Sequence, residues 1–111
     1  MKAAKKSTDV DISEVLRLII AGDVQALQGV FYRQPDLVHA KEETNFNTCL
    51  HVASSRGLMP VVHMLVAKKV NVNAQDMYGN TALHYACDKG RKNIIEFLLQ
   101  SGSNPNLSDH R

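Results

Sequence analysis

Two histidines and two cysteines are the side chains of this sequence best suited to chemistry. His51 and His84 resemble a metal-binding or acid-base pair, and Cys49 and Cys87 are the only cysteines. Zinc needs about four converging nitrogen, sulfur or carboxylate ligands. Neither cysteine recurs at the position of the other, whereas the two histidines are separated by a spacing that other residues share. We therefore predict no metal site and give the histidines a structural role.

Catalytic motifs do not occur in the sequence. A nucleophile requires a base within hydrogen-bond reach and a third group that orients the base. No Gly-x-Ser-x-Gly, glycine-rich phosphate loop or His-Glu-x-x-His is present. We predict that the chain is not an enzyme and binds no cofactor. Cys49 sits at an expected helix start, where the helix dipole favours a reactive thiolate, but an inert small residue is the preferred interpretation.

Composition and charge are typical of a single globular domain. The chain has 111 residues, of which 44% are hydrophobic and 22% are charged. A net charge of +2 gives no footprint for nucleic acid or a membrane surface. The apolar stretch 61–67 is much shorter than the ~18 to 20 residues of a spanning helix, and no secretory signal follows the N-terminus. We expect reduced thiols, a cytoplasmic or else nuclear location, and neither a membrane nor a nucleic-acid partner.

A repeat with a period of 33 residues organises the chain. Five residues recur at this offset, and the two sets are Thr48, Leu50, His51, Ala53, Gly57 and Thr81, Leu83, His84, Ala86, Gly90. The aliphatic residues at 61, 62, 65 and 66 recur at 94, 95, 98 and 99. A weaker first copy lacks the Thr and His but carries Gly22 before its second aliphatic stripe. About three stacked copies are the minimum for a stable repeat stack.

Each copy predicts two helices and a protruding turn. Thr48 and Thr81 are expected helix N-caps, and Gly57 and Gly90 end the short helices that follow them. The next aliphatic residues form the stripe of a second helix that is buried on one side. Residues 73–79 are rich in Asn, Asp and Gly, which is the composition of a turn projecting between helix pairs.

These residues resemble the ankyrin repeat, whose pattern places Asp and Gly in a turn before Thr, Pro, Leu, His, one variable residue and Ala. The third copy carries Asp76, Gly79 and the run 81–86, with Ala82 at the usual proline position. The resemblance implies an all-α solenoid of stacked helix-turn-helix units with protruding β-turn loops. It also implies that each repeated histidine bonds to turn backbone and to its neighbouring threonine. The implied structural motif consists of Thr48, Leu50, His51, Gly57, Thr81, Leu83, His84 and Gly90.

We divide the chain into a flexible basic tail and one repeat domain. The tail is residues 1–11 and the domain is residues 12–111, with a divergent capping repeat at 12–42, a second repeat at 43–75 and a third at 76–108. Residues 109–111 resemble the start of a further, truncated repeat. A truncation would leave the side of the last helix pair that carries Ile95 and Leu99 without a polar cap, so self-association through that face would be unsurprising.

Two positions depart from the pattern where it normally has glycine. Phe46 stands where Gly79 stands one repeat later, and we expect Asn45 to adopt the positive φ of that turn instead. Lys69 stands at the position of Gly102, where a left-handed conformation costs a non-glycine residue roughly 1 kcal/mol. The second repeat is therefore predicted to be locally softer than the third.

The resemblance implies a non-catalytic protein-interaction module, an adaptor, scaffold or inhibitor, because stacked helix pairs offer a preformed concave surface. Partner-binding residues are predicted at the turn tips and on the outward side of the first helices: Asn45, Phe46, Asn47, Ser55, Arg56, Met77, Tyr78, Asn80, Asp88 and Lys89. Phe46, Met77 and Tyr78 would form an apolar ridge beside the basic residues, unless Phe46 folds down into its turn. The alternative is an ankyrin segment excised from a larger enzyme or channel, where it positions or regulates the catalytic or membrane part.

Overall fold

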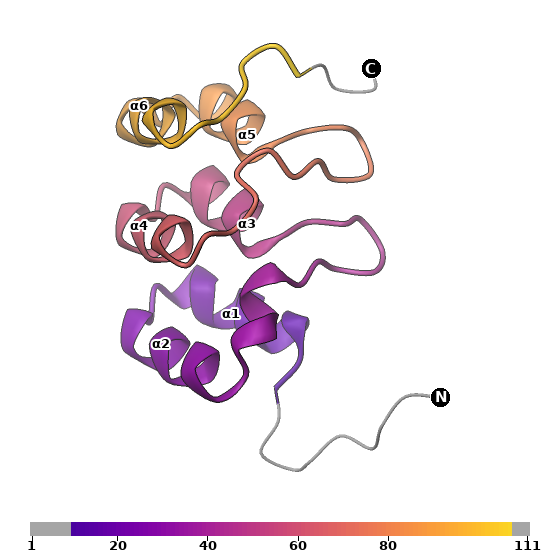
Figure 1. Ribbon diagram of the computed structural model, residues 1–111, viewed down its shortest axis with the longest axis vertical. Helices are drawn as coiled ribbons and strands as arrows, with labels where there is room; N and C mark the ends of the chain where they lie inside the picture. Colours follow the sequence, from indigo (N-terminus) through magenta and orange to yellow (C-terminus); the bar gives the residue numbers. More distant parts are fainter. Residues whose placement is uncertain (1–9, 108–111) are drawn as a thin grey trace.

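The chain folds into three antiparallel helix pairs stacked along its long axis, with loops projecting to one side (Figure 1). The computed structural model describes residues 10–107. Its helices are α1 (Ile12–Ala21), α2 (Val24–Arg33), α3 (Cys49–Arg56), α4 (Met59–Ala67), α5 (Ala82–Asp88) and α6 (Lys92–Gln100), with a short 3₁₀ helix η1 (Pro35–His39). Within this range, β-type pairing is limited to one isolated antiparallel bridge between Lys41 and Thr48. The predicted all-α stack of helix pairs is confirmed.

The inner helices of the second and third pairs begin with the same reciprocal cap. The backbone N–H of His51 donates to Thr48 Oγ1 at 3.4 Å, and the Thr48 N–H donates to His51 Nδ1 at 3.0 Å. His84 and Thr81 make the equivalent pair of bonds at 3.3 and 2.8 Å. Because these bonds satisfy otherwise unpaired N–H groups of the first turn, they fix where α3 and α5 start.

The first pair starts without this motif. The Asp11 carboxylate caps α1 by accepting from the Glu14 N–H at 3.0 Å. Val10 exchanges two hydrogen bonds with the Gln34 side chain, at 3.0 and 3.1 Å. These bonds connect Val10 and Asp11, the last two residues of the predicted tail, to the first helix pair. The division of the chain at residue 11 stays a prediction. The rest of that tail, and the predicted further turn at 109–111, lie outside the described residues.

The expected left-handed backbone occurs at the glycines that end the helices, but also at two larger residues. Gly57 has a φ of 75° at the end of α3, whereas Phe46 and Lys69 have φ values of 62° and 66°. The expectation that Asn45 replaces Phe46 in this conformation is therefore wrong. The Asn45 side chain instead accepts from the Asn47 N–H at 2.9 Å, an Asx-type bond that fixes the residues on both sides of Phe46.

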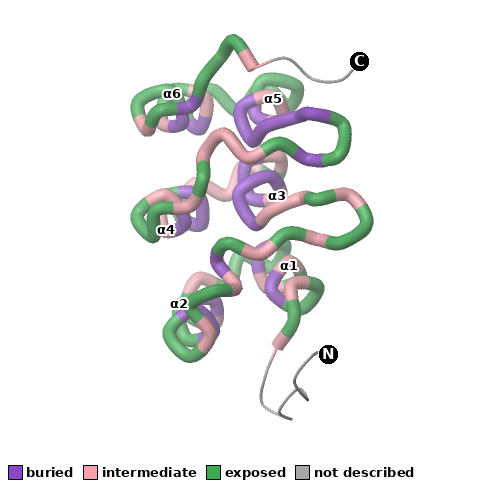
Figure 2. The backbone as a smooth tube through the Cα atoms, turned by 45° about the vertical axis from the view of Figure 1, so that its right-hand side comes forward, coloured by how far each residue is buried: buried purple, intermediate pink, exposed green. Residues whose placement is uncertain are grey.

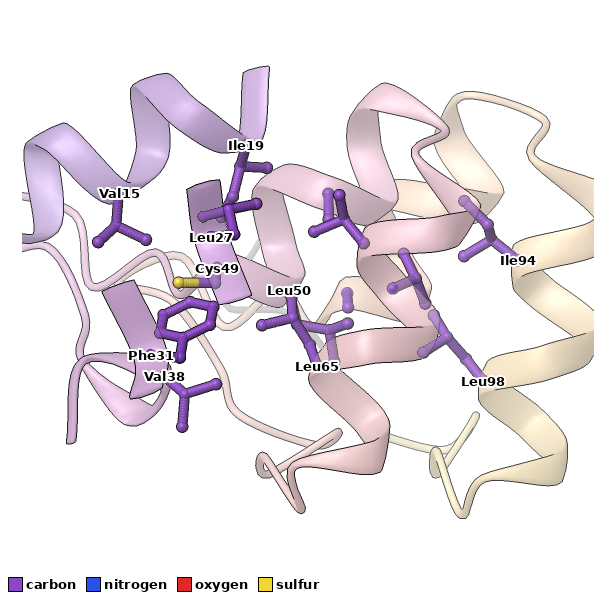
Figure 3. Close-up of a cluster of buried hydrophobic side chains, with 14 of the residues drawn as sticks. Val15, Ile19, Leu27, Phe31, Val38, Cys49, Leu50, Leu65, Ile94 and Leu98 are labelled. Atoms are coloured by element: carbon purple, nitrogen blue, oxygen red, sulfur yellow. The ribbon is translucent and has the colours of Figure 1, made fainter. Parts of the chain in front are cut away.

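A continuous hydrophobic core runs through all three pairs. The buried residues of each helix lie on the side that faces the neighbouring helices (Figure 2). Figure 3 shows side chains from successive pairs meeting in this core, among them Ile19 of α1, Leu50 of α3 and Leu98 of α6. Helix α3 contacts both α1 and α5. Each pair therefore buries apolar surface that it could not shield alone, which is the physical basis of stability in a stacked repeat.

Hydrogen bonds join the second and third pairs at four separate places. They run from Met77 N to Asn45 O (2.9 Å), from His51 Nε2 to Asn80 O (2.9 Å), from the Arg91 guanidinium to Ser55 O (3.3 Å), and from Asn73 Nδ2 to Gly102 O (3.2 Å). The Asn73 side chain also accepts from the Asn104 N–H at 2.7 Å. The contacts extend from the projecting loops to the far ends of the helices, so the orientation of the two pairs is fixed along their whole interface.

Candidate functional site

Two finger loops, residues 41–48 and 74–81, project from the N-terminal ends of α3 and α5 (Figure 1). Glu42 N–H donates to Asn47 O at 2.8 Å across the first loop, and Asp76 N–H donates to Asn80 O at 2.9 Å across the second. The bond from Met77 to Asn45 joins the two loops directly. The fingers therefore form one connected wall beside the inner helices.

The finger tips carry three exposed apolar side chains. The exposed fractions are 42% for Phe46, 46% for Met77 and 56% for Tyr78. The Lys41 ammonium lies 4.6 Å from the centroid of the Phe46 ring, a cation–π contact at the surface. Phe46 therefore remains accessible rather than filling the space beneath its turn. We refer to Phe46, Met77 and Tyr78 as the tip ridge.

A buried carboxylate supports the second finger from beneath. Asp76 Oδ1 accepts from the N–H groups of Tyr78 and Asn80, both at 2.9 Å, and Asp76 Oδ2 accepts from the Tyr85 hydroxyl. Burial, and then the hydrogen bond to Asp76, raises the pKa of Tyr85. The phenol is therefore a fixed donor near neutral pH, and it couples the finger to α5.

His51 is a buried structural residue. Its Nε2 donates to the Asn80 carbonyl while its Nδ1 accepts from Thr48, and its ring meets the Tyr85 ring edge to face at 5.7 Å. Burial lowers the pKa of His51, which keeps the ring neutral and in the tautomer that these bonds require. Within residues 10–107, His, Cys, Asp and Glu side chains nowhere gather in a group of three that could hold a metal ion.

Asn80, one of the predicted contact residues, is buried. Only 7% of this residue is accessible, because its backbone N–H bonds to Asp76 and its carbonyl accepts from His51. The residue thus lies inside the junction of the two repeats. Although Asn80 contributes to the lining of a hollow along α5, little of its surface is open to a partner, so we leave it out of the proposed contact residues.

The two cysteines lie in opposite environments. Cys49 is completely buried in the core, and desolvation raises the pKa of its thiol to about 12. The alternative of a reactive thiolate at this helix start is therefore excluded, because burial outweighs any effect of the helix dipole. Cys87 is exposed on α5.

The inner helices α1, α3 and α5 lie side by side and form a concave groove next to the fingers. A hollow of about 310 Å³ follows α3 and is lined by Leu16, Ile20, Glu42, Asn47, His51, Val52, Ser55, Arg56 and Tyr85. A second hollow of about 420 Å³ follows α5 and is lined by Asn80, His84, Tyr85, Cys87 and Asp88. Tyr85 belongs to both hollows, so they are neighbouring parts of one groove.

Sequence reasoning found part of this groove and missed its apolar lining. Val52 and Tyr85 occupy the one variable position between the repeated His and Ala, and this position in the repeat pattern is the sequence signal for both residues. Leu16 and Ile20 belong to the divergent first repeat, where the repeat pattern is weakest. Aligning Gly22 with Gly57 would have placed Ile20 opposite Ser55, one of the predicted contact residues.

The predicted charged residues lie at the end of the groove that is remote from the fingers. Arg56, Asp88 and Lys89 are all exposed around the C-terminal ends of α3 and α5. Across the described part of the chain, no ion pair involves either Arg56 or Lys89. Both cations are therefore available to a ligand.

The architecture and its loops agree with a comparison against known families. A family model described as ankyrin repeats, in three copies, matches residues 1–109, a range that includes all six α-helices and both fingers. None of the helices in residues 10–107 has the length and apolar character needed to cross a bilayer.

Proposed function

Because the chain belongs to the ankyrin repeat family, whose members are generally non-catalytic protein-interaction modules, we propose that it captures a partner protein with its concave groove and tip ridge. The observation that carries this proposal is the exposure of Phe46, Met77 and Tyr78 on fingers that hydrogen bonds hold in place. Exposed apolar side chains on a rigid frame are typical of binding surfaces.

Rigidity supports the proposal as much as composition does. The finger bonds, the Asp76 support and the reciprocal helix caps exist before any partner arrives. Binding to such a preformed surface avoids the conformational entropy that ordering a loop would cost. The aromatic and arginine residues beside the groove are also the types enriched among residues that dominate binding energy.

Nine of the ten predicted contact residues stay in the proposal. They are Asn45, Phe46, Asn47, Ser55, Arg56, Met77, Tyr78, Asp88 and Lys89, and Ile20, Val52 and Tyr85 join them. An adaptor, scaffold or inhibitor would use such a surface in the same way. We also propose a cytoplasmic setting, in keeping with the two free cysteines.

Site-specific photocrosslinking tests the proposed binding face. A benzophenone amino acid is introduced in place of Tyr78 on the tip ridge or in place of Tyr32, which is 88% exposed on the outer helix α2. After irradiation in cells, we expect a discrete protein adduct from position 78 and none from position 32. The same adducts from both positions, or an adduct from position 32 alone, would contradict the proposal.

Self-association through the last helix pair stays a separate prediction. Leu99 is exposed on α6 and Ile95 is partly exposed beside it. Light scattering over a range of protein concentrations measures this directly. A monomer at every concentration would contradict the prediction without affecting the proposed binding face.

A further inference from the structure

The hollow along α3 has a more apolar lining than the second hollow. Its apolar lining comes from Leu16 and Ile20 of α1, Val52 of α3 and Tyr85 of α5. The volume of about 310 Å³ lies at the small end of ligand sites, which start near ~300 Å³. This size suits one or two side chains of a peptide better than a whole cofactor.

The walls of this hollow are preformed. The Tyr85 hydroxyl is bonded to Asp76, and the Tyr85 ring contacts His51, so its position does not depend on a ligand. Ile20 is exposed although it belongs to a helix whose neighbouring residue Ile19 is completely buried. An apolar side chain entering the hollow would remove the exposed surface of Ile20 from water, which is the main favourable term in such contacts.

The charge at the far end of the hollow is predominantly positive. Arg56 lines the hollow itself, and Lys89 occupies the equivalent position one repeat later. Arg91 brings a third cation to this edge, because its guanidinium donates to the carbonyl of Ser55, the residue that precedes Arg56. Among the described residues, Asp88 at the end of α5 and Asp23 just after the end of α1 are the acidic residues of this edge, so three cations face two carboxylates. We call Arg56, Lys89 and Arg91 the basic edge.

The opposite end of the hollow is acidic. Glu42 lies at the base of the first finger, where its carboxylate accepts from the Thr44 hydroxyl at 3.3 Å. A peptide in the hollow therefore experiences negative charge near the fingers and positive charge near the ends of the inner helices. This asymmetry favours one direction of binding.

From this arrangement we propose that the hollow receives the apolar anchor of an acidic peptide segment in the partner protein. A leucine-like or phenylalanine-like side chain enters between Ile20, Val52 and Tyr85, and carboxylates next to it in the segment pair with the basic edge. The inference rests on the proposed function and adds the chemical class of the partner segment. Charge complementarity selects this occupant over a basic or neutral apolar segment.

Selection from phage-displayed random dodecapeptides tests this inference on the whole chain. We expect the enriched peptides to contain an aliphatic or aromatic residue with Asp or Glu within a few positions of it. One enriched peptide, labelled with fluorescein, then gives dissociation constants by fluorescence polarisation. Ile20→Glu should weaken binding by about tenfold or more, the effect of removing a central anchor contact.

Charge reversal gives the sharper measurement. Arg56→Glu should weaken binding of the acidic peptide by roughly two- to fivefold. A selection repeated on this variant should no longer favour acidic residues. Matched controls are Tyr32→Glu and Arg33→Glu, which change an exposed apolar residue and a last-turn arginine on the outer helix α2. Both controls should bind as the parent chain does, and unchanged melting temperatures should show that all four variants are folded.

Several outcomes would overturn the inference, and they differ in what they leave standing. Enriched peptides that lack acidic residues, or that bind Ile20→Glu normally but lose binding on Tyr78→Ala, would refute the acidic-anchor inference and leave the proposed binding face intact. A dimer of the chain that Ile20→Glu dissociates would identify a second copy as the occupant of the hollow. No enrichment, together with no crosslink from position 78, would refute both proposals.

Discussion

The two fingers follow similar backbone paths but are stabilised by different interactions. In the second finger, Gly79 supplies the left-handed turn residue and Asp76 bonds to the loop from a buried position. In the first finger, Phe46 adopts a positive φ and Glu43, the counterpart of Asp76, is exposed. A left-handed conformation is unfavourable for a residue with a Cβ atom. The comparison teaches that one loop shape can be held by a buried carboxylate around a glycine, or by loop hydrogen bonds that keep a residue with a Cβ atom in the left-handed conformation.

This difference bears directly on binding. In the first finger, the left-handed residue is Phe46, and its side chain is exposed at the tip. In the second finger, the left-handed residue is Gly79, which has no side chain, and the exposed residues are Met77 and Tyr78 just before it. The fingers thus present different side chains at shifted positions on similar backbones.

Truncating the core leucines should have the largest effect. Leu83→Ala and Leu50→Ala remove equivalent buried side chains and should each lower the free energy of unfolding by roughly 2 to 5 kcal/mol. We expect Leu50→Ala to be at least as damaging, because α3 has helices on both sides. Urea unfolding measures both effects. The matched surface variant Met77→Ala/Tyr78→Ala should unfold nearly as the parent does, and an equal loss in all three would disprove the assignment of core and tips.

Removing the carboxylate of Asp76 in the second finger should lower stability more than removing the carboxylate of Glu43 in the first finger. Asp76→Ala leaves two backbone N–H groups and the Tyr85 hydroxyl without their acceptor, so it should lower the free energy of unfolding by about 2 kcal/mol. Glu43→Ala changes the exposed counterpart, whose interactions water can replace, so it should cost less than Asp76→Ala. Chemical denaturation of both variants checks this contrast. Similar losses for the two would mean that the fingers are held alike.

Acidification should weaken the junction of the two repeats through His51. Burial lowers the pKa of His51 in the folded chain below its ordinary value of 6.5, so below that pH the unfolded chain binds a proton that the folded chain does not. The stability linked to this ring is therefore complete above pH 6.5 and decreases as the pH falls toward the folded-state pKa.

His51→Gln isolates this effect. The variant should be less stable near neutral pH but should lose less stability than the parent when the pH is lowered to about 5. His39→Gln, at an exposed position, serves as the control and should keep the pH dependence of the parent. The two variants are compared by denaturant unfolding at several pH values. An unchanged pH dependence in His51→Gln would assign the acid sensitivity to other groups.

Relieving the strained helix ending should have the smallest effect. Lys69→Gly removes a Cβ atom from a left-handed residue and should raise the free energy of unfolding by about 0.5 to 1 kcal/mol, after the greater entropy of glycine in the unfolded chain is subtracted. Gly102→Ala makes the opposite change at the counterpart and should destabilise by a similar amount. Thermal unfolding of the pair provides the test, and a destabilised Lys69→Gly would show that no strain is stored there.

The helix pairs were predictable because local signals and the 33-residue period agree. Thr48 and Thr81 mark helix starts, Gly57 marks a helix end, and the aliphatic stripes mark the buried faces. The exposure of Tyr78 at a turn tip was also predictable from the same pattern. When local preference and overall architecture agree in this way, the structure of a repeat protein can be predicted from its sequence.

The remaining features depend on contacts between residues far apart in the sequence. Asn80 is buried because His51 reaches its carbonyl from the previous repeat. The resemblance implies a bond from this histidine to turn backbone, but the repeat pattern does not say which turn residue accepts it. Phe46 takes the left-handed conformation although asparagine tolerates it better, because neighbouring loop bonds outweigh local preference. The apolar wall from Ile20 escaped prediction because the first repeat diverges from the other two.

The four hydrogen-bonded contacts between the second and third pairs have a mechanical consequence. They lie at the finger tips, at His51, at the Ser55 end of α3 and at the Asn73 loop, so no single line remains about which one pair could rock against the other. The distance from an atom on one pair to its equivalent on the next is therefore nearly constant. Equivalent sites on the two pairs therefore have a fixed spacing. A bound segment whose side chains are spaced differently would have to change its own conformation to contact both sites.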